Sequence, residues 1–187
     1  MQSDEELMLA YVRGDPSAFH ELFRRYAPLL LRLMRRELSS QSEAQDLVQQ
    51  TFLQIHRARN DFDPARRLKP WVYTIALNLK REYLRGRKRR PTQPLEQSPE
   101  PGVEAVDPEV QDRARALRRV LAALPAQQRE VIELHWFDEL SFQEVGQALG
   151  ISTTAAKVRA HRGYVRLKEA LSGLGLGNLA PGGGIEP

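Results

Sequence analysis

Apolar residues recur three or four positions apart along most of the chain, with polar residues between them. This spacing places the apolar side chains on one face of an α-helix, whereas a strand would need strict alternation, which no stretch sustains. The recurring apolar positions are Phe19, Leu22, Phe23 and Tyr26, then Leu47, Val48, Phe52 and Ile55, then Trp71, Ile75 and Leu79. The pattern therefore predicts an all-α protein.

Capping residues indicate where these helices begin. Asp15 followed by Pro16 is typical of a helix start, because the carboxylate caps the first turn and proline fits within it. Pro28 leaves two possibilities open, a kinked continuation of this helix or the start of a new one. Ser42 with Gln45 forms a capping-box pattern, which predicts the start of the next helix there.

A basic stretch ends the first half of the chain. The turn residues in 60–69 predict a loop, followed by a helix that begins near Pro70 and carries seven Lys and Arg residues between positions 80 and 90. One interpretation of this run is a solvated helix end. The other is a site for single-stranded nucleic acid, because aromatic residues that can stack on bases lie nearby. Among these aromatics, Trp71 has core spacing, and we expect it in the core.

Residues 91–112 separate this half from the rest of the chain. They include five prolines, six acidic residues and no basic residue, a composition typical of a flexible linker. We therefore expect two small helical domains, 1–90 and 113–172, followed by a flexible glycine-rich tail at 173–187. Within the second domain, an amphipathic helix that stops at Pro125 precedes another helix.

The segment 140–171 has the pattern of a helix-turn-helix. Ser141 with Glu144 forms a capping box that opens a short helix. Gly150 permits a sharp turn with positive φ, and Ser152 caps the longer helix that follows. In this motif the second helix enters the major groove of DNA, and its basic residues suit base edges and phosphates. The alternative is a helical hairpin with a solvated basic face.

Charge is distributed unevenly along the chain. Residues 1–90 include 18 basic and 11 acidic residues, residues 91–112 only six acidic ones, and residues 113–172 include 10 basic and six acidic. Basic domains favour a polyanion such as nucleic acid or an anionic membrane, and charge alone does not choose between them. No apolar run reaches the ~20 residues of a membrane span. The acidic amino terminus does not match a secretory signal, so we expect a cytoplasmic protein without membrane insertion.

No pattern of residues indicates an enzyme or a metal site. The chain has no cysteine, which excludes disulfides and zinc–cysteine sites. Asp46 and Glu43 lie near His56, but a second His or Cys at ligand spacing is missing, so we interpret His56 as a surface or packing residue. We find no phosphate-binding glycine loop, nucleophile elbow or catalytic triad. We expect no catalytic residue, no metal and no cofactor.

Taken in order, these segments resemble the ECF (extracytoplasmic-function) class of bacterial sigma factors over residues 4–172. Residues 43–57 are similar to the helix that docks on the clamp helices of the polymerase largest subunit. Residues 68–90 are similar to the helix that opens and reads the promoter minus-ten element. Residues 113–172 resemble the domain that binds the minus-thirty-five element as duplex.

The resemblance implies roles for individual residues. The expected polymerase-binding residues are Asp46, Gln49 and Gln50. The expected minus-ten residues are Phe62, Asp63, Arg66 and Arg67 in a base-capturing loop, Asn78 beside the pocket, and Lys80, Arg81 and Arg85 along the helix. The expected minus-thirty-five residues are Lys157, Val158, Arg159, His161 and Arg162. The chain departs from the family at Ala156 and Ala160, where larger apolar residues are common.

The implied function is that of a sigma factor, which directs core RNA polymerase to particular promoters. The implied partners are core polymerase, through its clamp helices and its flap, promoter DNA, and an anti-sigma factor. One alternative is a conventional regulator with the same helix-turn-helix, which would bind duplex promoter DNA without polymerase. Another is a protein-interaction module whose basic surfaces meet an acidic partner, which would bind no promoter.

Overall fold

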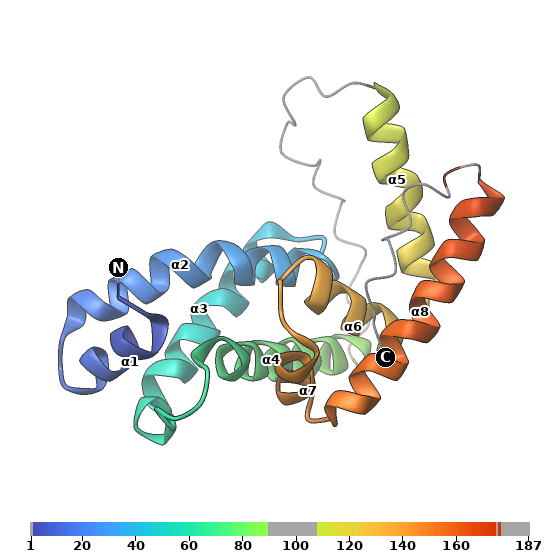
Figure 1. Cartoon of the computed structure of the whole chain (residues 1–187). Helices are drawn as coiled ribbons and strands as arrows, with labels where there is room; N and C mark the ends of the chain where they lie inside the picture. The colour runs from blue at the N-terminus through green and yellow to red at the C-terminus, as the bar shows by residue number, and fades with distance from the viewer. Residues whose placement is uncertain (1, 90–107, 175, 177–187) are drawn as a thin grey trace. The chain divides into compact units, whose positions relative to one another are not determined.

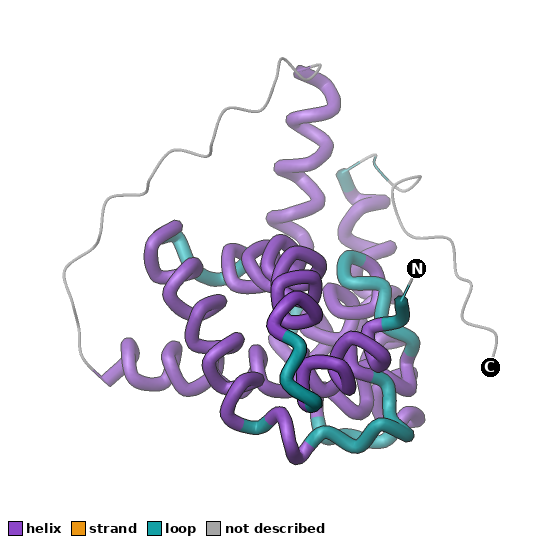
Figure 2. Tube along the Cα trace, turned by 90° about the vertical axis from the view of Figure 1, so that its left-hand side faces the viewer, coloured by secondary structure: helices purple, strands orange, loops and turns teal. Residues whose placement is uncertain are grey.

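The chain divides into two compact units, residues 1–99 and 100–187. The structure is a computed structural model, and it describes residues 2–89, 108–174 and 176. Throughout this described part the chain forms helices joined by loops, without a strand (Figures 1 and 2). The predicted all-α fold is therefore confirmed. None of the described helices is both long and apolar enough to cross a membrane.

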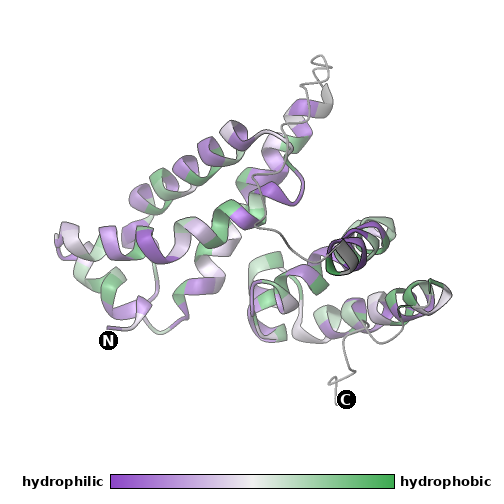
Figure 3. Ribbon diagram, turned by 90° about the horizontal axis from the view of Figure 1, so that it is seen from above, coloured by the Kyte–Doolittle hydropathy of each residue, from purple (hydrophilic) through white to green (hydrophobic). Residues whose placement is uncertain are grey.

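Both units combine short helices with at least one helix of 20 or more residues. The first unit contains α1 (Asp4–Val12), α2 (Pro16–Arg35), α3 (Gln41–Arg57), the short 3-10 helix η1 (Arg59–Asp61) and α4 (Leu68–Arg89). The second unit contains α5 (Pro108–Ala123), α6 (Ala126–Trp136), α7 (Phe142–Leu149) and α8 (Thr153–Gly173). Hydrophobic and hydrophilic residues alternate around these helices, as expected when each buries one face (Figure 3).

The start of α2 agrees with the sequence. Asp15 accepts hydrogen bonds from the Ser17 hydroxyl (2.6 Å) and amide (2.8 Å), which hold the pKa of Asp15 below its usual value. Pro16 is the first helical residue. Proline fits at this position because the N–H that it lacks would have no acceptor within the helix. The helix continues through Pro28, so the possibility of a new helix at this proline is wrong.

The start of α3 differs from the prediction. Its cap is Ser40, which accepts a hydrogen bond from the Glu43 amide at 3.3 Å, and not Ser42 paired with Gln45. Both serines are followed three residues later by Glu or Gln, so the sequence pattern fits either one. The earlier start is favoured because each added residue extends a helix that is already nucleated.

The start of α4 is supported by α1. The helix begins at Leu68, so Pro70 falls in the first turn, where its missing N–H is not needed. The Glu5 carboxylate accepts a hydrogen bond from the Leu68 amide at 2.9 Å. This bond satisfies one of the amides that a helix start leaves unpaired, and the negative charge suits the positive end of the helix dipole. The first helix of the unit therefore helps to position the last.

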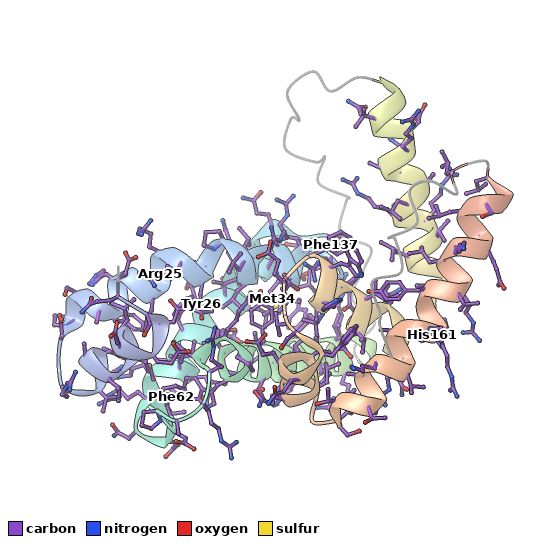
Figure 4. The ribbon with its side chains drawn as sticks, viewed as in Figure 1. Arg25, Tyr26, Met34, Phe62, Phe137 and His161 are labelled. Carbon is purple, nitrogen blue, oxygen red and sulfur yellow. The ribbon has the colours of Figure 1, made fainter. Side chains whose placement is uncertain are left out.

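The core of the first unit combines buried apolar side chains with polar contacts between helices. Its large buried side chains include Met8, Leu30, Leu33, Met34, Leu47 and Leu77. Asp4 of α1 accepts hydrogen bonds from Arg25 and Tyr26 of α2, each at 2.6 Å (Figure 4). Burial, together with this bond to Asp4, raises the pKa of Tyr26 well above its usual range. These contacts fasten α1 to α2.

The second unit begins earlier than predicted. Its first helix, α5, starts at Pro108, so the last five residues of the expected linker 91–112 are helical. The pair Asp107-Pro108 repeats the Asp–Pro start of α2, and the proline-rich, acidic composition around it concealed this signal. The other expected linker residues and most of the expected tail lie outside the described residues. The core of this unit contains Val120, Leu121, Leu124, Ile132, Leu167 and Leu171.

Candidate functional sites

Helices α7 and α8 form the predicted helix-turn-helix. The Ser141 hydroxyl accepts a hydrogen bond from the Glu144 amide (3.2 Å), and the Glu144 carboxylate accepts one from the Ser141 amide (2.8 Å). Gly150 ends α7 in the left-handed region, with φ of 67°. Ser152 then accepts a hydrogen bond from the Ala155 amide at 3.1 Å and caps α8. Local bonds of the kind predicted therefore define the turn.

The two helices of this motif approach closely at Gly146. A Cβ atom at this position would lie 2.8 Å from the Ile151 carbonyl oxygen and 3.3 Å from the Thr153 amide nitrogen. Both neighbours belong to the backbone and cannot rotate away, so the close approach requires glycine. The direction in which α8 leaves the turn depends on this missing side chain.

The buried face of α8 begins with small residues. Its buried positions are Ala156, Ala160, Gly163, Leu167 and Leu171. Ala156 and Ala160 are fully buried, so both departures from the family lie in the core. A Cβ atom at Gly163 would lie 2.6 Å from Cδ1 of Ile132. At this point the missing side chain lets α6 pack directly against the backbone of α8.

The residues expected to contact the minus-thirty-five element lie together in the first half of α8. Lys157, Val158, His161 and Arg162 are exposed, and Arg159 is half-buried. Figure 4 labels His161 among them. Because the small buried residues fix the rotation of the helix, this set faces away from the core of its own unit. The arrangement presents hydrogen-bond donors along one helix face, which is what major-groove recognition needs.

Three of the expected minus-ten residues share an outward row on α4. The buried positions along the middle of this helix are Val72, Tyr73, Ala76, Leu77 and Lys80. Asn78 and Arg85 are exposed away from them, and Arg81 is half-buried. The exposed Glu82 lies in the same row. The spacing of three and four residues keeps these side chains neighbours on one face.

Lys80 lies on the opposite face of α4 from this row. It is 2% exposed, and its ammonium donates a hydrogen bond to Glu37 at 2.7 Å. Lys80 follows Ala76 by four residues and Leu77 by three, so it shares their buried face. Its charge is satisfied within the unit, so Lys80 does not share the outward row with the other expected minus-ten residues of α4.

A second ion pair joins the end of α4 to the start of α3. Arg87 donates to the Glu43 carboxylate at 3.3 Å. Burial and a hydrogen bond to Glu43 raise the pKa of Tyr83 to about 12. Glu43 thus binds two residues of α4 in addition to its place in the first turn of α3.

The loop before α4 divides into a buried and an exposed part. Phe62 is 7% exposed, and its ring centroid lies 5.5 Å from that of Trp71 (Figure 4 labels Phe62). Asp63 accepts a hydrogen bond from the Ala65 amide at 3.0 Å and pairs with Arg66 at 3.3 Å. Arg66 and the neighbouring Arg67, both expected minus-ten residues, are exposed. Phe62 instead packs beneath the loop.

The polar residues expected to bind polymerase are all exposed on α3. Asp46, Gln49 and Gln50 are placed at spacings of three and four on the side away from the core. Leu53 continues this row, and its side chain is 48% exposed. Leu53 was not among the expected polymerase-binding residues, although it follows Gln49 by four positions and Gln50 by three. A large apolar side chain in a polar row is a common feature of protein interfaces.

Other exposed apolar residues were not expected either. Phe23 on α2 is 43% exposed, and its ring lies 4.6 Å from that of the buried Phe52. Trp136 and Phe137 at the end of α6 are 46% and 43% exposed. Trp136 donates a hydrogen bond to the Tyr164 hydroxyl. In the described parts of the chain, no three His, Asp or Glu side chains are grouped so as to hold a metal ion.

A helix-turn-helix with an exposed basic second helix defines a DNA-binding protein. Two family profiles match the two units: Sigma-70 region 2 matches residues 22–90, and Sigma-70 region 4 matches residues 114–167. The chain is 37% identical over 164 residues to RNA polymerase sigma factor CarQ of Myxococcus xanthus, covering 87% of this chain and 94% of that protein. It is 32% identical over 177 residues to ECF RNA polymerase sigma factor SigM of Mycobacterium tuberculosis, covering 94% and 88%.

Solved structures agree with these relatives. CnrH, in complex with the cytosolic domain of CnrY, matches with a TM-score of 0.71 and 25% identity over 92% of this chain and 99% of CnrH. The sigma factor RpoE of Bartonella quintana, in complex with the anti-sigma factor NepR, matches with a TM-score of 0.67 and 25% identity over 82% and 96%. The chain belongs to the sigma-70 family, as an ECF sigma factor, and is a factor of transcription initiation.

Proposed function

We propose that this sigma factor binds core RNA polymerase through the outer face of α3, opens and reads the minus-ten element with α4, and binds the minus-thirty-five element with α8. The observation that carries the proposal is that both expected recognition helices, α4 and α8, expose a polar or basic row while their other face is buried in the core of their unit. The two units also follow each other in the order that the family has. The chemistry of RNA synthesis would belong to core polymerase, and the chain would act in the bacterial cytoplasm as a non-catalytic factor.

The outer face of α3 is the proposed polymerase site. Asp46, Gln49 and Gln50 provide hydrogen-bonding groups, and Leu53 provides apolar surface that water leaves on binding. Binding energy in protein interfaces concentrates at residues that neighbouring contacts shield from water, and the three polar residues can shield Leu53 in this way. We therefore expect Leu53 to contribute at least as much to polymerase affinity as any of the three polar residues.

The outward row of α4 and the loop before it form the proposed minus-ten site. Arg66 and Arg67 on the loop, with Arg81 and Arg85 on the helix, provide positive charge for the backbone of an unpaired strand. Asn78 provides a donor and an acceptor for a base edge. Removing a base from the stack costs a few kcal/mol, which pocket contacts and phosphate pairing offset, so melting and reading are one process.

The first half of α8 is the proposed duplex site. Lys157, His161 and Arg162 provide donors for base edges and phosphates of the minus-thirty-five element. Joining this site and the minus-ten site in one chain increases overall affinity beyond that of either alone.

We also propose that an anti-sigma factor holds this chain inactive. The similar proteins CnrH and RpoE were both solved in complex with a partner protein, and the partner of RpoE is the anti-sigma factor NepR.

Run-off transcription tests the proposal. Purified bacterial core polymerase is supplied with DNA fragments that include the region upstream of the chain's own gene, with and without the protein. Specific initiation is expected only when the protein is present. If the protein shifts promoter DNA by itself at physiological salt and leaves core polymerase inactive, the chain acts as a conventional duplex-binding regulator and the proposal fails.

A matched pair of substitutions tests the polymerase site. Leu53→Asp places a charge in the proposed interface and is expected to lower initiation about tenfold or more. Val12→Asp makes the same change at another exposed apolar residue, which is 37% exposed at the end of α1, and is expected to leave initiation unchanged. Equal effects of the two substitutions would argue against the α3 face.

A further inference from the structure

Val158 occupies the most outward position on the first half of α8. Each residue of an α-helix turns about 100° from the one before. Val158 is two residues from both Ala156 and Ala160, so its side chain is directed about 160° away from each of them around the helix axis. Those two alanines are fully buried, whereas Val158 is 43% exposed. The side chain therefore points away from the core of its unit, and the packing of the second unit does not account for an apolar residue there.

Three of the four neighbours of Val158 on the helix are polar or basic, and the fourth, Ala155, is half-buried. Thr154 and Arg162 lie four residues to either side, and His161 lies three residues on, so all are next to Val158 on the helix surface. Each offers a hydrogen-bonding group, and Val158 offers only methyl groups. If this face is inserted in the major groove, Val158 meets base edges at a point where no donor or acceptor is supplied.

We propose that Val158 is a specificity-determining residue that recognises the C5-methyl group of a thymine in the minus-thirty-five element. The thymine methyl is the apolar group that the four base pairs display in the major groove, and apolar side chains contact it in protein–DNA complexes. Cytosine in its place has only a hydrogen at C5, so the contact between valine and the methyl group would be lost. The inference rests on the proposed function, and adds to it the base that this position selects.

Val165 provides a matched control on the same helix. It is 44% exposed and lies on the same side as Val158, seven residues further along. Seven residues correspond to about 10 Å along the helix axis. In helix-turn-helix proteins the residues near the start of the second helix contact base edges. We therefore assign methyl recognition to Val158 and not to Val165.

The test uses holoenzyme assembled from core polymerase and the full chain. A promoter is first selected by this holoenzyme from duplexes with a randomised minus-thirty-five element. Each thymine of the selected element is then replaced singly with uracil, which removes only the methyl group, and equilibrium competition measures binding. At one thymine we expect about fourfold weaker binding, the effect of withdrawing one methylene-sized apolar group from burial.

The same uracil replacement is then measured with two variant holoenzymes. Val158→Ala is expected to bind the thymine and uracil promoters about equally, whereas Val165→Ala is expected to keep the full wild-type difference. The inference is overturned if no uracil weakens wild-type binding, if no thymine is selected, or if the methyl effect survives Val158→Ala. If none of the selected promoters supports initiation, the proposed function is overturned as well. If initiation is intact but no uracil replacement weakens binding, this inference alone is overturned.

Discussion

The basic helix of the first unit is held by charged contacts, whereas that of the second is held by close backbone approach. Three carboxylates fix α4: Glu5 at its first residue, Glu37 on Lys80 and Glu43 on Arg87. All three belong to residues that precede α4 by more than 20 positions in the chain. The rotation of α4, and with it the direction of its outward row, therefore depends on these charged contacts as well as on its buried apolar face.

In the second unit, the position of α8 depends on two glycines that let backbone segments approach closely. Gly146 lets α7 meet the backbone of the turn, and Gly163 lets α6 meet the backbone of α8. The rotation of α8 therefore depends on volume. We therefore expect these two helices, which have similar proposed tasks, to respond to different kinds of substitution. Each of the following predictions changes one of the two sets of contacts.

The largest effect is expected from removing the partner of the buried ammonium. Glu37→Ala leaves Lys80, whose side chain is 3% exposed, without the carboxylate beside it. Loss of one partner of a buried ion pair costs about 3 kcal/mol. We expect the free energy of opening of the first unit to fall by this amount, measured by native-state hydrogen exchange at the amides of α4.

The control for this prediction removes the charge itself. Lys80→Met replaces the buried ammonium with an apolar side chain of similar volume, and Glu37, at 32% side-chain exposure, keeps access to water. We expect a cost of about 1 kcal/mol or less. If Glu37→Ala were as mild as Lys80→Met, the charged contact would not be what holds α4 in place.

An intermediate effect is expected in the helix-turn-helix. Gly146→Ala forces the Ile151 carbonyl away from the new Cβ atom. Because the turn that contains Ile151 leads directly into α8, this movement would displace α8. The expected cost is about 2 kcal/mol in the stability of the second unit, the usual scale of overpacking. Hydrogen exchange at the amides of α7 and α8 measures it, and promoter binding by holoenzyme should weaken in parallel.

Gly86→Ala on α4 provides the matched control, because no atom lies within 4 Å of a Cβ at that position. Alanine favours helix by about 1 kcal/mol over glycine, so this variant should be neutral or slightly more stable. If the two alanine variants behaved alike, close approach at Gly146 would not position α8.

Local sequence signals predicted several helix boundaries in the helix-turn-helix and at the start of α2 correctly. The capping box at Ser141 and Glu144, the left-handed Gly150 and the Asp15-Pro16 helix start each depend on residues within four positions. Such patterns succeed because the groups that satisfy a helix end belong to the same short segment. They failed at α3, where two serines fit the same pattern and nothing local distinguished them.

The placement of individual side chains was harder to predict. Lys80 is one of seven basic residues between 80 and 90, and its buried partner Glu37 lies 43 positions earlier. The family resemblance placed Lys80 with the DNA-facing residues, but its three- and four-residue spacing from Leu77 and Ala76 indicated the buried face. Phe62 likewise stands in a loop that the resemblance assigns to DNA, and only the fold brings Trp71 against it.

The smallest effect is expected at Gly163, because the atom in the way is the end of a flexible side chain. Gly163→Ala places Cβ 2.6 Å from Cδ1 of Ile132, and we expect a cost of about 1 kcal/mol, at the low end of overpacking.

A second substitution at this contact tests the explanation. Ile132→Val removes that Cδ1 and alone costs about 1 kcal/mol as a small cavity. In the double variant the new methyl fills part of the space vacated by the old one, so the two costs should not add. Relief stays incomplete, because Cβ of Gln128 lies 3.3 Å from the same position. Additive costs in thermal and hydrogen-exchange measurements would show that volume at this contact does not position α8.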